Sequence, residues 1–150
     1  MSETAEAGYR GPQVCKIVGI TYRQLDYWAR TNLVRPSVMD AQGSGTQRLY
    51  SFRDLLELKV IKQMLDAGIA LQSARKAVES LRNFGEDLAS VRIVIQGASV
   101  VLAETDEQVM DLMRDGQGVL NIVPLAPVVQ TITDAVQLTL DTGTASAAAR

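Results

Sequence analysis

The sequence predicts a mainly helical first half with a helix-turn-helix, followed by a small α+β domain in the order β-β-α-β-α. Two short amphipathic segments flank a tight turn at Gly19, which is typical of a helix-turn-helix. After residue 90 the apolar residues become β-branched and group into strand-like runs. The charge also divides: residues 1–85 hold 12 basic and 8 acidic side chains, whereas residues 86–150 hold 3 and 9. This asymmetry indicates a polyanion-binding module joined to a second domain.

The composition excludes several classes of protein. The chain has 150 residues, 47% of them hydrophobic and 21% charged, which is ordinary for a globular protein. No apolar run approaches the roughly 18 residues of a membrane span, and the first residues do not form a secretory signal. We therefore expect a cytoplasmic protein. With one cysteine and no histidine, we expect no metal site, no cofactor and no enzyme that uses a histidine base.

The first domain is expected over residues 12–83, after a flexible tail at residues 1–11. Pro12 opens a short helix at its first turn, and Gly19 supplies the turn after it. Thr21 is an N-cap for a second helix over residues 22–30. Asn32 can end that helix, because Asn tolerates the left-handed conformation.

A hairpin is expected between residues 36–39 and 47–50, with a tip at residues 43–45 that contains two glycines. Ser51 then caps a helix that ends near Gly68, and Asp54 completes a short variant of the capping box. A further helix is expected over residues 71–82.

The second domain is expected over residues 88–140, beyond a break near residues 83–87. Gly97-Ala98 is a two-residue hairpin turn, and Thr105 with Gln108 forms a capping box. The expected elements are strands 91–96 and 99–104, helix 106–114, strand 119–125 and helix 128–140. Residues 141–150 are expected to form a flexible tail.

Basic and aromatic side chains on the second helix carry the functional signal. Arg23, Tyr27 and Arg30 share one face at spacings of four and three, while Leu25 points toward a core. A cationic stripe with an aromatic residue, beside a hairpin that carries Arg48, suits a phosphate backbone and a groove. The alternative is a solvated helix face beside an ordinary loop.

Residues 20–37 and 45–79 together resemble the DNA-binding domain of the MerR family of bacterial regulators. The family pattern is a helix-turn-helix, a wing that ends in a YRLYS phrase followed by DL, and a later helix start of the form GxSL. Here the first phrase is Gln47–Ser51 with Asp54 and Leu55 after it, and the second is Gly68–Leu71. The resemblance covers about half of the chain and implies a winged helix-turn-helix.

The resemblance implies specific DNA contacts. Trp28 and Tyr50 have an alternative role, which is packing within the domain. Asp26 departs from the family, which often has Arg there, so it is expected to orient Arg23 or Arg30 or to accept from a cytosine amino group. The implied DNA-binding residues are Thr21, Tyr22, Arg23, Gln24, Tyr27, Trp28, Arg30, Arg48, Tyr50 and Lys62.

The resemblance therefore implies a transcriptional regulator that binds promoter DNA as a homodimer, with RNA polymerase as a further candidate partner. No small-molecule effector is identifiable. Residues 88–140 are expected to form the dimer interface, because their strands are apolar on both faces and a second copy can cover one of them. The alternative is a protein-interaction adaptor whose winged helix does not read DNA.

Overall fold

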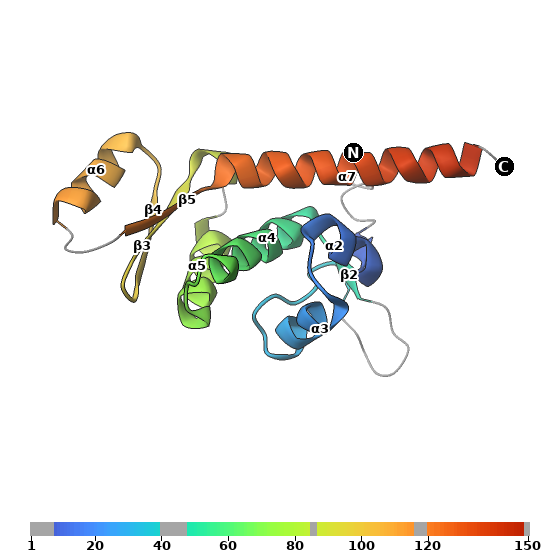
Figure 1. Ribbon diagram of the computed structural model, residues 1–150, viewed down its shortest axis with the longest axis horizontal. Helices are drawn as coiled ribbons and strands as arrows, with labels where there is room; N and C mark the ends of the chain where they lie inside the picture. The colour runs from blue at the N-terminus through green and yellow to red at the C-terminus, as the bar shows by residue number, and fades with distance from the viewer. Residues whose placement is uncertain (1–7, 40–47, 85–86, 116–119, 149–150) are drawn as a thin grey trace. The chain divides into compact units, whose positions relative to one another are not determined.

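The computed structural model describes residues 8–39, 48–84, 87–115 and 120–148 (Figure 1). The chain forms two compact units, Met1–Lys62 with Thr131–Arg150, and Gln63–Gln130. The divisions fall within the helices α4 (Phe52–Asp66) and α7 (Leu125–Ala148). The domain boundary expected near residues 83–87 therefore stays a prediction.

The first unit opens with a helix-turn-helix formed by α2 (Gly11–Val18) and α3 (Tyr22–Arg30). Gly19 adopts φ 84°, and its N–H donates to the Cys15 carbonyl at 2.8 Å, which ends α2 in the left-handed conformation that favours glycine. Asn32 has φ 63° after the end of α3, which confirms the predicted stop. Val14 and Leu25 are buried in the core.

A short two-stranded sheet joins the segment before the helix-turn-helix to a segment after it. β1 (Tyr9–Arg10) pairs antiparallel with β2 (Leu49–Tyr50). On its other side Leu49 forms an antiparallel bridge with Met39, and its N–H donates to the Met39 carbonyl at 2.7 Å. The predicted hairpin is confirmed at this bridge, whereas its tip and Gln47 lie outside the described residues. The prediction of a tail through residue 11 was wrong for β1, because a strand of two residues forms only by non-local pairing.

Asp54 fixes the start of α4 (Phe52–Asp66). Its carboxylate, only 5% exposed, accepts hydrogen bonds from the Ser51 N–H at 2.9 Å, the Ser37 N–H at 2.7 Å and the Ser37 hydroxyl at 2.8 Å. The Asp54 N–H donates in turn to Ser51 Oγ at 3.0 Å, which confirms the predicted capping box. Asp54 thus ties the segment after α3 to the first turn of α4.

We expect Asp54→Ala to lower the free energy of unfolding by about 2–3 kcal/mol, because it removes a helix cap and leaves three donors of part-buried hydrogen bonds without their acceptor. Urea denaturation measures the loss. Asp87→Ala is the matched control: Asp87 also caps a helix, accepting from the Ala89 N–H at 3.0 Å, but it is exposed. Its replacement should cost less than about 1 kcal/mol. Equal losses for both variants would contradict a special role for the buried network.

The second unit holds α5 (Leu71–Phe84) and the 3-10 turn η1 (Leu88–Ser90). It also holds a three-stranded antiparallel sheet in the order β4 (Ser99–Ala103), β3 (Arg92–Gln96), β5 (Leu120–Pro124). The Gly97-Ala98 turn joins the first two strands, with Gly97 at φ 58°. The predicted β-β-α-β-α order is confirmed by β3 (Arg92–Gln96), β4 (Ser99–Ala103), α6 (Asp106–Asp115), β5 (Leu120–Pro124) and α7 (Leu125–Ala148).

α7 differs from its prediction at both ends. It begins at Leu125, so Pro127 occupies the first turn rather than preceding the helix. It continues to Ala148, through residues that were expected to form a tail. Among the described residues, no helix combines the length and the apolar character that a membrane span requires.

The two faces of the three-stranded sheet are covered differently. Ile93 and Ile95 of β3 are buried on one face, and α5 packs against β4. On the opposite face Val94 forms a small core with Ala103 and with Val109 of α6. Lys76 of α5 also donates to the Ala98 carbonyl at 2.9 Å. The second unit therefore has a local core on each side of β3.

Candidate nucleic-acid interface

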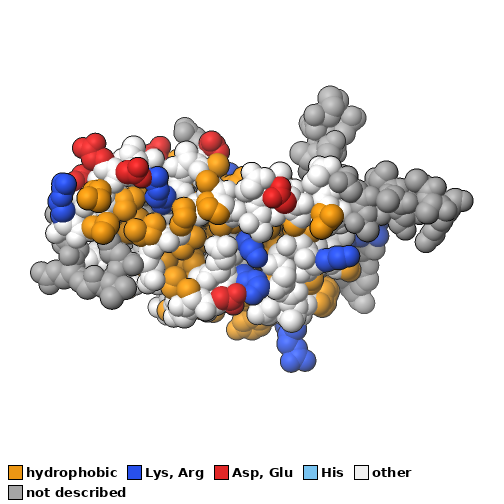
Figure 2. Space-filling view, turned by 45° about the horizontal axis from the view of Figure 1, so that its top comes forward, with side chains coloured by type: hydrophobic (Ala, Val, Ile, Leu, Met, Phe, Trp, Pro, Cys, Tyr) orange, Lys and Arg blue, Asp and Glu red, His pale blue; other side chains and the backbone are white. Residues whose placement is uncertain are grey.

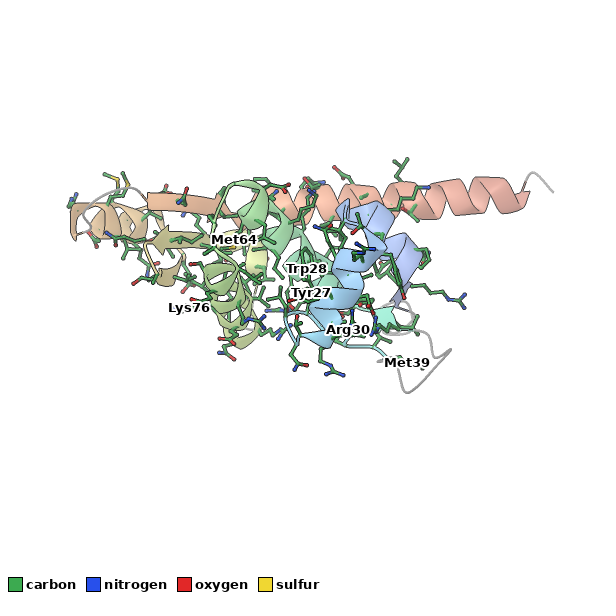
Figure 3. All side chains as sticks on the ribbon, turned by 60° about the horizontal axis from the view of Figure 1, so that its bottom comes forward. Tyr27, Trp28, Arg30, Met39, Met64 and Lys76 are labelled. Atoms are coloured by element: carbon green, nitrogen blue, oxygen red, sulfur yellow. The ribbon has the colours of Figure 1, made fainter. Side chains whose placement is uncertain are left out.

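α3 presents a basic and aromatic surface. Tyr22, Arg23, Tyr27 and Arg30 are all exposed, whereas Leu25 on the other side of the helix is buried. Figure 3 shows Tyr27 and Arg30 along this helix. The structure thus brings together the exposed stripe that the spacing predicted.

A capping box fixes the start of α3. Thr21 Oγ1 accepts from the Gln24 N–H at 3.1 Å, and Gln24 Oε1 accepts from the Thr21 N–H at 3.1 Å. This reciprocal pair satisfies two of the free N–H groups at the helix end. Both side chains are exposed, and their DNA contacts stay a prediction.

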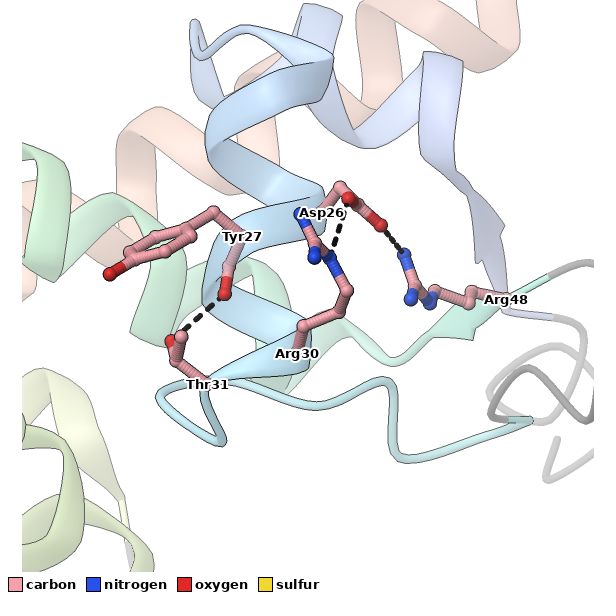
Figure 4. A network of polar contacts seen from close by, with 5 residues as sticks. All are labelled: Asp26, Tyr27, Arg30, Thr31 and Arg48. Atoms are coloured by element: carbon pink, nitrogen blue, oxygen red, sulfur yellow. Dashed lines mark hydrogen bonds and ion pairs between the residues drawn. The ribbon is translucent and has the colours of Figure 1, made fainter.

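Asp26 joins two arginines from different parts of the chain. Its carboxylate accepts from Arg30 Nε at 2.9 Å and from Arg48 at 2.7 Å (Figure 4). The pair with Arg30 lies along one helix, but Arg48 is 22 positions away, just before β2. Tyr27 projects away from this group, and its carbonyl accepts from the Thr31 hydroxyl at 2.8 Å.

The hydrogen bond from Arg48 is the main cause that lowers the pKa of Asp26, and the bond from Arg30 adds to it. Asp26 is therefore ionised at neutral pH. The expectation that Asp26 orients Arg30 is confirmed. The sequence did not predict that Asp26 also pairs with Arg48, because no periodicity relates positions that are 22 residues apart. Asp26 thus holds a cation of the β2 segment beside the exposed face of α3.

Two predicted contact residues are buried instead. Tyr50 is 0% exposed and Trp28 is 5% exposed. Packing within the domain, which was the alternative considered for each, describes both residues in this structure. Their contact with DNA stays a prediction. A helix of nine residues that packs on α2 must bury one face, and Trp28 lies on that face with Leu25 and Ala29.

Lys62 and Cys15 lie near the turn of the helix-turn-helix. Lys62 is half-buried, and a Cβ placed on Gly19 would come within 3.7 Å of its Cε. Cys15 is half-buried, and burial raises the pKa of its thiol. Phosphate contact by Lys62 stays a prediction, while Cys15 is a neutral thiol at physiological pH.

The order and geometry of α2, the Gly19 turn and α3 define a helix-turn-helix protein with a small sheet beside the second helix. The family model described as "MerR HTH family regulatory protein" matches residues 9–81. The chain therefore belongs to the MerR family.

Two curated relatives match most of this chain and are longer than it. The chain is 55% identical over 116 residues to an uncharacterized HTH-type transcriptional regulator of Mycobacterium tuberculosis and to one of Mycobacterium bovis. The match covers 77% of this chain and 52% of each relative. The chain thus spans about half the length of the curated relatives it matches.

Proposed function

We propose that this protein is a sequence-specific transcriptional regulator of the MerR type, which binds promoter DNA as a homodimer through its helix-turn-helix and wing. The observation that carries the proposal is the exposed stripe on α3 with Arg48 anchored beside it. Family membership and the printed names of the relatives support the same activity. We also propose that the protein is cytoplasmic and that it contacts RNA polymerase at the promoter.

The geometry suggests a division of work between helix and wing. α3 is the element that would enter the major groove, where Arg23 at its second position can reach a guanine edge. The guanidinium of Arg48 lies just before β2, where it could contact a phosphate of the flanking DNA backbone. A dimer would present two such units to a two-fold operator.

An electrophoretic mobility shift with the DNA upstream of the protein's own gene tests this function. We expect a discrete complex that survives an excess of unrelated DNA. Failure to bind any DNA, together with retained helical structure, would favour the alternative of an adaptor whose winged helix contacts a protein.

We also expect the affinity to depend steeply on salt. If each protomer neutralises about four phosphates, a dimer neutralises about eight, and the slope of log K against log salt concentration is roughly −7. Titrations between about 50 and 200 mM salt cover the range where this term dominates. A slope shallower than about −3 would count against docking of two helix-turn-helix units.

A further inference from the structure

We propose that Arg10 is a further DNA-binding residue, whose guanidinium contacts a backbone phosphate next to the one that Arg48 contacts. The inference rests on the proposed function and adds a residue to it. Arg10 is the second residue of β1, and its side chain is exposed. Residues 1–11 were expected to form a tail, so only the structure brings Arg10 to the candidate interface. Arg10 and the elements around it lie in the first unit.

The pairing of β1 with β2 places Arg10 beside the segment that carries Arg48. Arg10 pairs with Leu49, and Arg48 is the residue directly before Leu49. Paired residues of an antiparallel ladder lie about 4.5–5.5 Å apart between Cα atoms. Tyr9 pairs with Tyr50, which is buried. Because successive side chains of a strand point to opposite faces, Arg10 points to the face opposite the buried Tyr50.

The residue after Arg10 lies against the start of α3. A Cβ placed on Gly11 would come within 3.2 Å of Cε1 of Tyr22, which is the first residue of α3. Arg23, the proposed base-reading residue, follows directly. Arg10 is therefore adjacent to both parts of the proposed interface, the start of α3 and the segment before β2.

The charge of Arg10 distinguishes it from the other arginines of this surface. Arg30 and Arg48 share the carboxylate of Asp26, which neutralises one of their two positive charges. Among the residues that the structure describes, Arg10 forms no ion pair. Figure 2 shows Lys and Arg side chains exposed on the surface around α2 and α3. The full charge of Arg10 is thus available to a phosphate, and it would account for one of the phosphate contacts in each protomer.

A salt titration of the full chain tests the contact. Fluorescence anisotropy measures the affinity of wild type and of Arg10→Ala for a duplex from the DNA upstream of the gene and for a scrambled duplex. A dimer that loses one phosphate contact in each protomer loses two, so the slope of log K against log salt concentration should become shallower by about 1.8. The ratio of wild-type affinity to variant affinity should therefore fall roughly twelvefold between about 50 and 200 mM salt, equally for both duplexes.

Two further variants serve as controls. Arg10→Lys keeps the positive charge, so its slope should equal that of wild type. Arg82→Ala removes the same charge from an exposed position on α5, outside the proposed interface, and should leave the slope unchanged. The Arg10 N–H donates to Gln13 Oε1 at 3.0 Å, and replacing the Arg10 side chain retains this backbone contact. Thermal unfolding of Arg10→Ala should accordingly match that of wild type.

Ethylation interference locates the contact on the DNA. Ethylation of a phosphate removes its negative charge, so it weakens binding wherever the protein contacts that phosphate. With Arg10→Ala, one phosphate in each half-site should lose this effect. That phosphate should be next to the one that loses its effect with Arg48→Ala, because the two arginines are neighbours across the β1–β2 ladder. Only complexes that form are compared, so a general loss of stability does not produce this pattern.

The outcomes separate this inference from the proposed function. A wild-type chain that binds the upstream duplex, with an unchanged slope and an unchanged interference pattern for Arg10→Ala, would overturn the Arg10 contact and leave the regulator proposal standing. If Arg10→Ala weakened binding to the upstream duplex alone, Arg10 would read a base and the phosphate assignment would be wrong. A wild-type chain that binds neither duplex would overturn the proposed function and the Arg10 contact together.

Discussion

Replacing Arg23 by alanine will reduce affinity for the operator much more than affinity for unrelated DNA, whereas replacing Arg48 will reduce both about equally. Arg23 is exposed at the start of α3, where it can read a base, and Arg48 lies beside the sheet, where it can hold a phosphate. A bidentate contact to guanine contributes about 1–3 kcal/mol, so two copies contribute about 2–6 kcal/mol to binding of the dimer.

Fluorescence anisotropy with an operator and with a scrambled duplex measures both affinities for each variant. Arg82→Ala is the charge-matched control, since Arg82 lies in the last turn of α5, outside the proposed interface. The affinity of the Arg82→Ala variant for both duplexes should fall only slightly, because of the small change in net charge. If Arg23→Ala and Arg48→Ala change the two affinities in the same ratio, the proposed division between base reading and phosphate contact is wrong.

We expect Asp26→Asn to tighten binding to unrelated DNA by about tenfold at low salt and to reduce the preference for the operator. Asp26 is ionised, so its negative charge neutralises one of the two positive charges of the arginines that it binds, Arg30 and Arg48. The amide keeps the shape but frees one cation in each protomer. A dimer should therefore gain about two phosphate contacts, which makes the salt slope steeper by about 1.8.

The pH dependence of this effect follows from the lowered pKa of Asp26. A carboxyl with a lowered pKa keeps its ion pairs above its usual range and loses them only as the pH falls through the lowered value. The difference between wild type and Asp26→Asn should thus be the same at pH 6 and pH 8. It should vanish only in acid below about pH 4, the ordinary range of an Asp carboxyl.

Glu79→Gln removes the same charge from an exposed position on α5 and serves as the control. It should leave the operator preference unchanged. If Asp26→Asn instead weakens binding to both duplexes, Asp26 acts mainly by holding Arg48 in place rather than by limiting its charge.

The sequence predicted best what is decided locally. The Thr21 N-cap and the left-handed Asn32 depend on residues within a few positions of each other, and both were found. The exposed stripe of α3 followed from helical periodicity alone. The DNA-contact role of Trp28 followed from the resemblance and not from periodicity, and Trp28 lies on the buried face of α3 with Leu25.

What the sequence could not predict depends on contacts between distant positions. The pair between Asp26 and Arg48 forms only because the segment before β2 lies beside α3. Tyr50 is buried in β2, which pairs with β1. No pattern in residues 1–11 predicts the strand β1. The sequence pattern therefore predicted the elements and the candidate surface. The partners of the charged residues could be identified only from the tertiary structure.

The pairing of β1 with β2 also sets an order of events during synthesis. Tyr9 pairs with Tyr50, which is 41 positions later. At about 5–20 residues per second, the ribosome needs about 2–8 s to supply that partner. α3 can meanwhile form around its own cap, whereas closing a loop of this length costs about 3 kcal/mol of chain entropy. Pulsed hydrogen exchange during refolding should accordingly protect the α3 amides before those of β2. Arg48 would then reach Asp26 after α3 has formed, so a chain stalled before Arg48 would carry α3 without this cation.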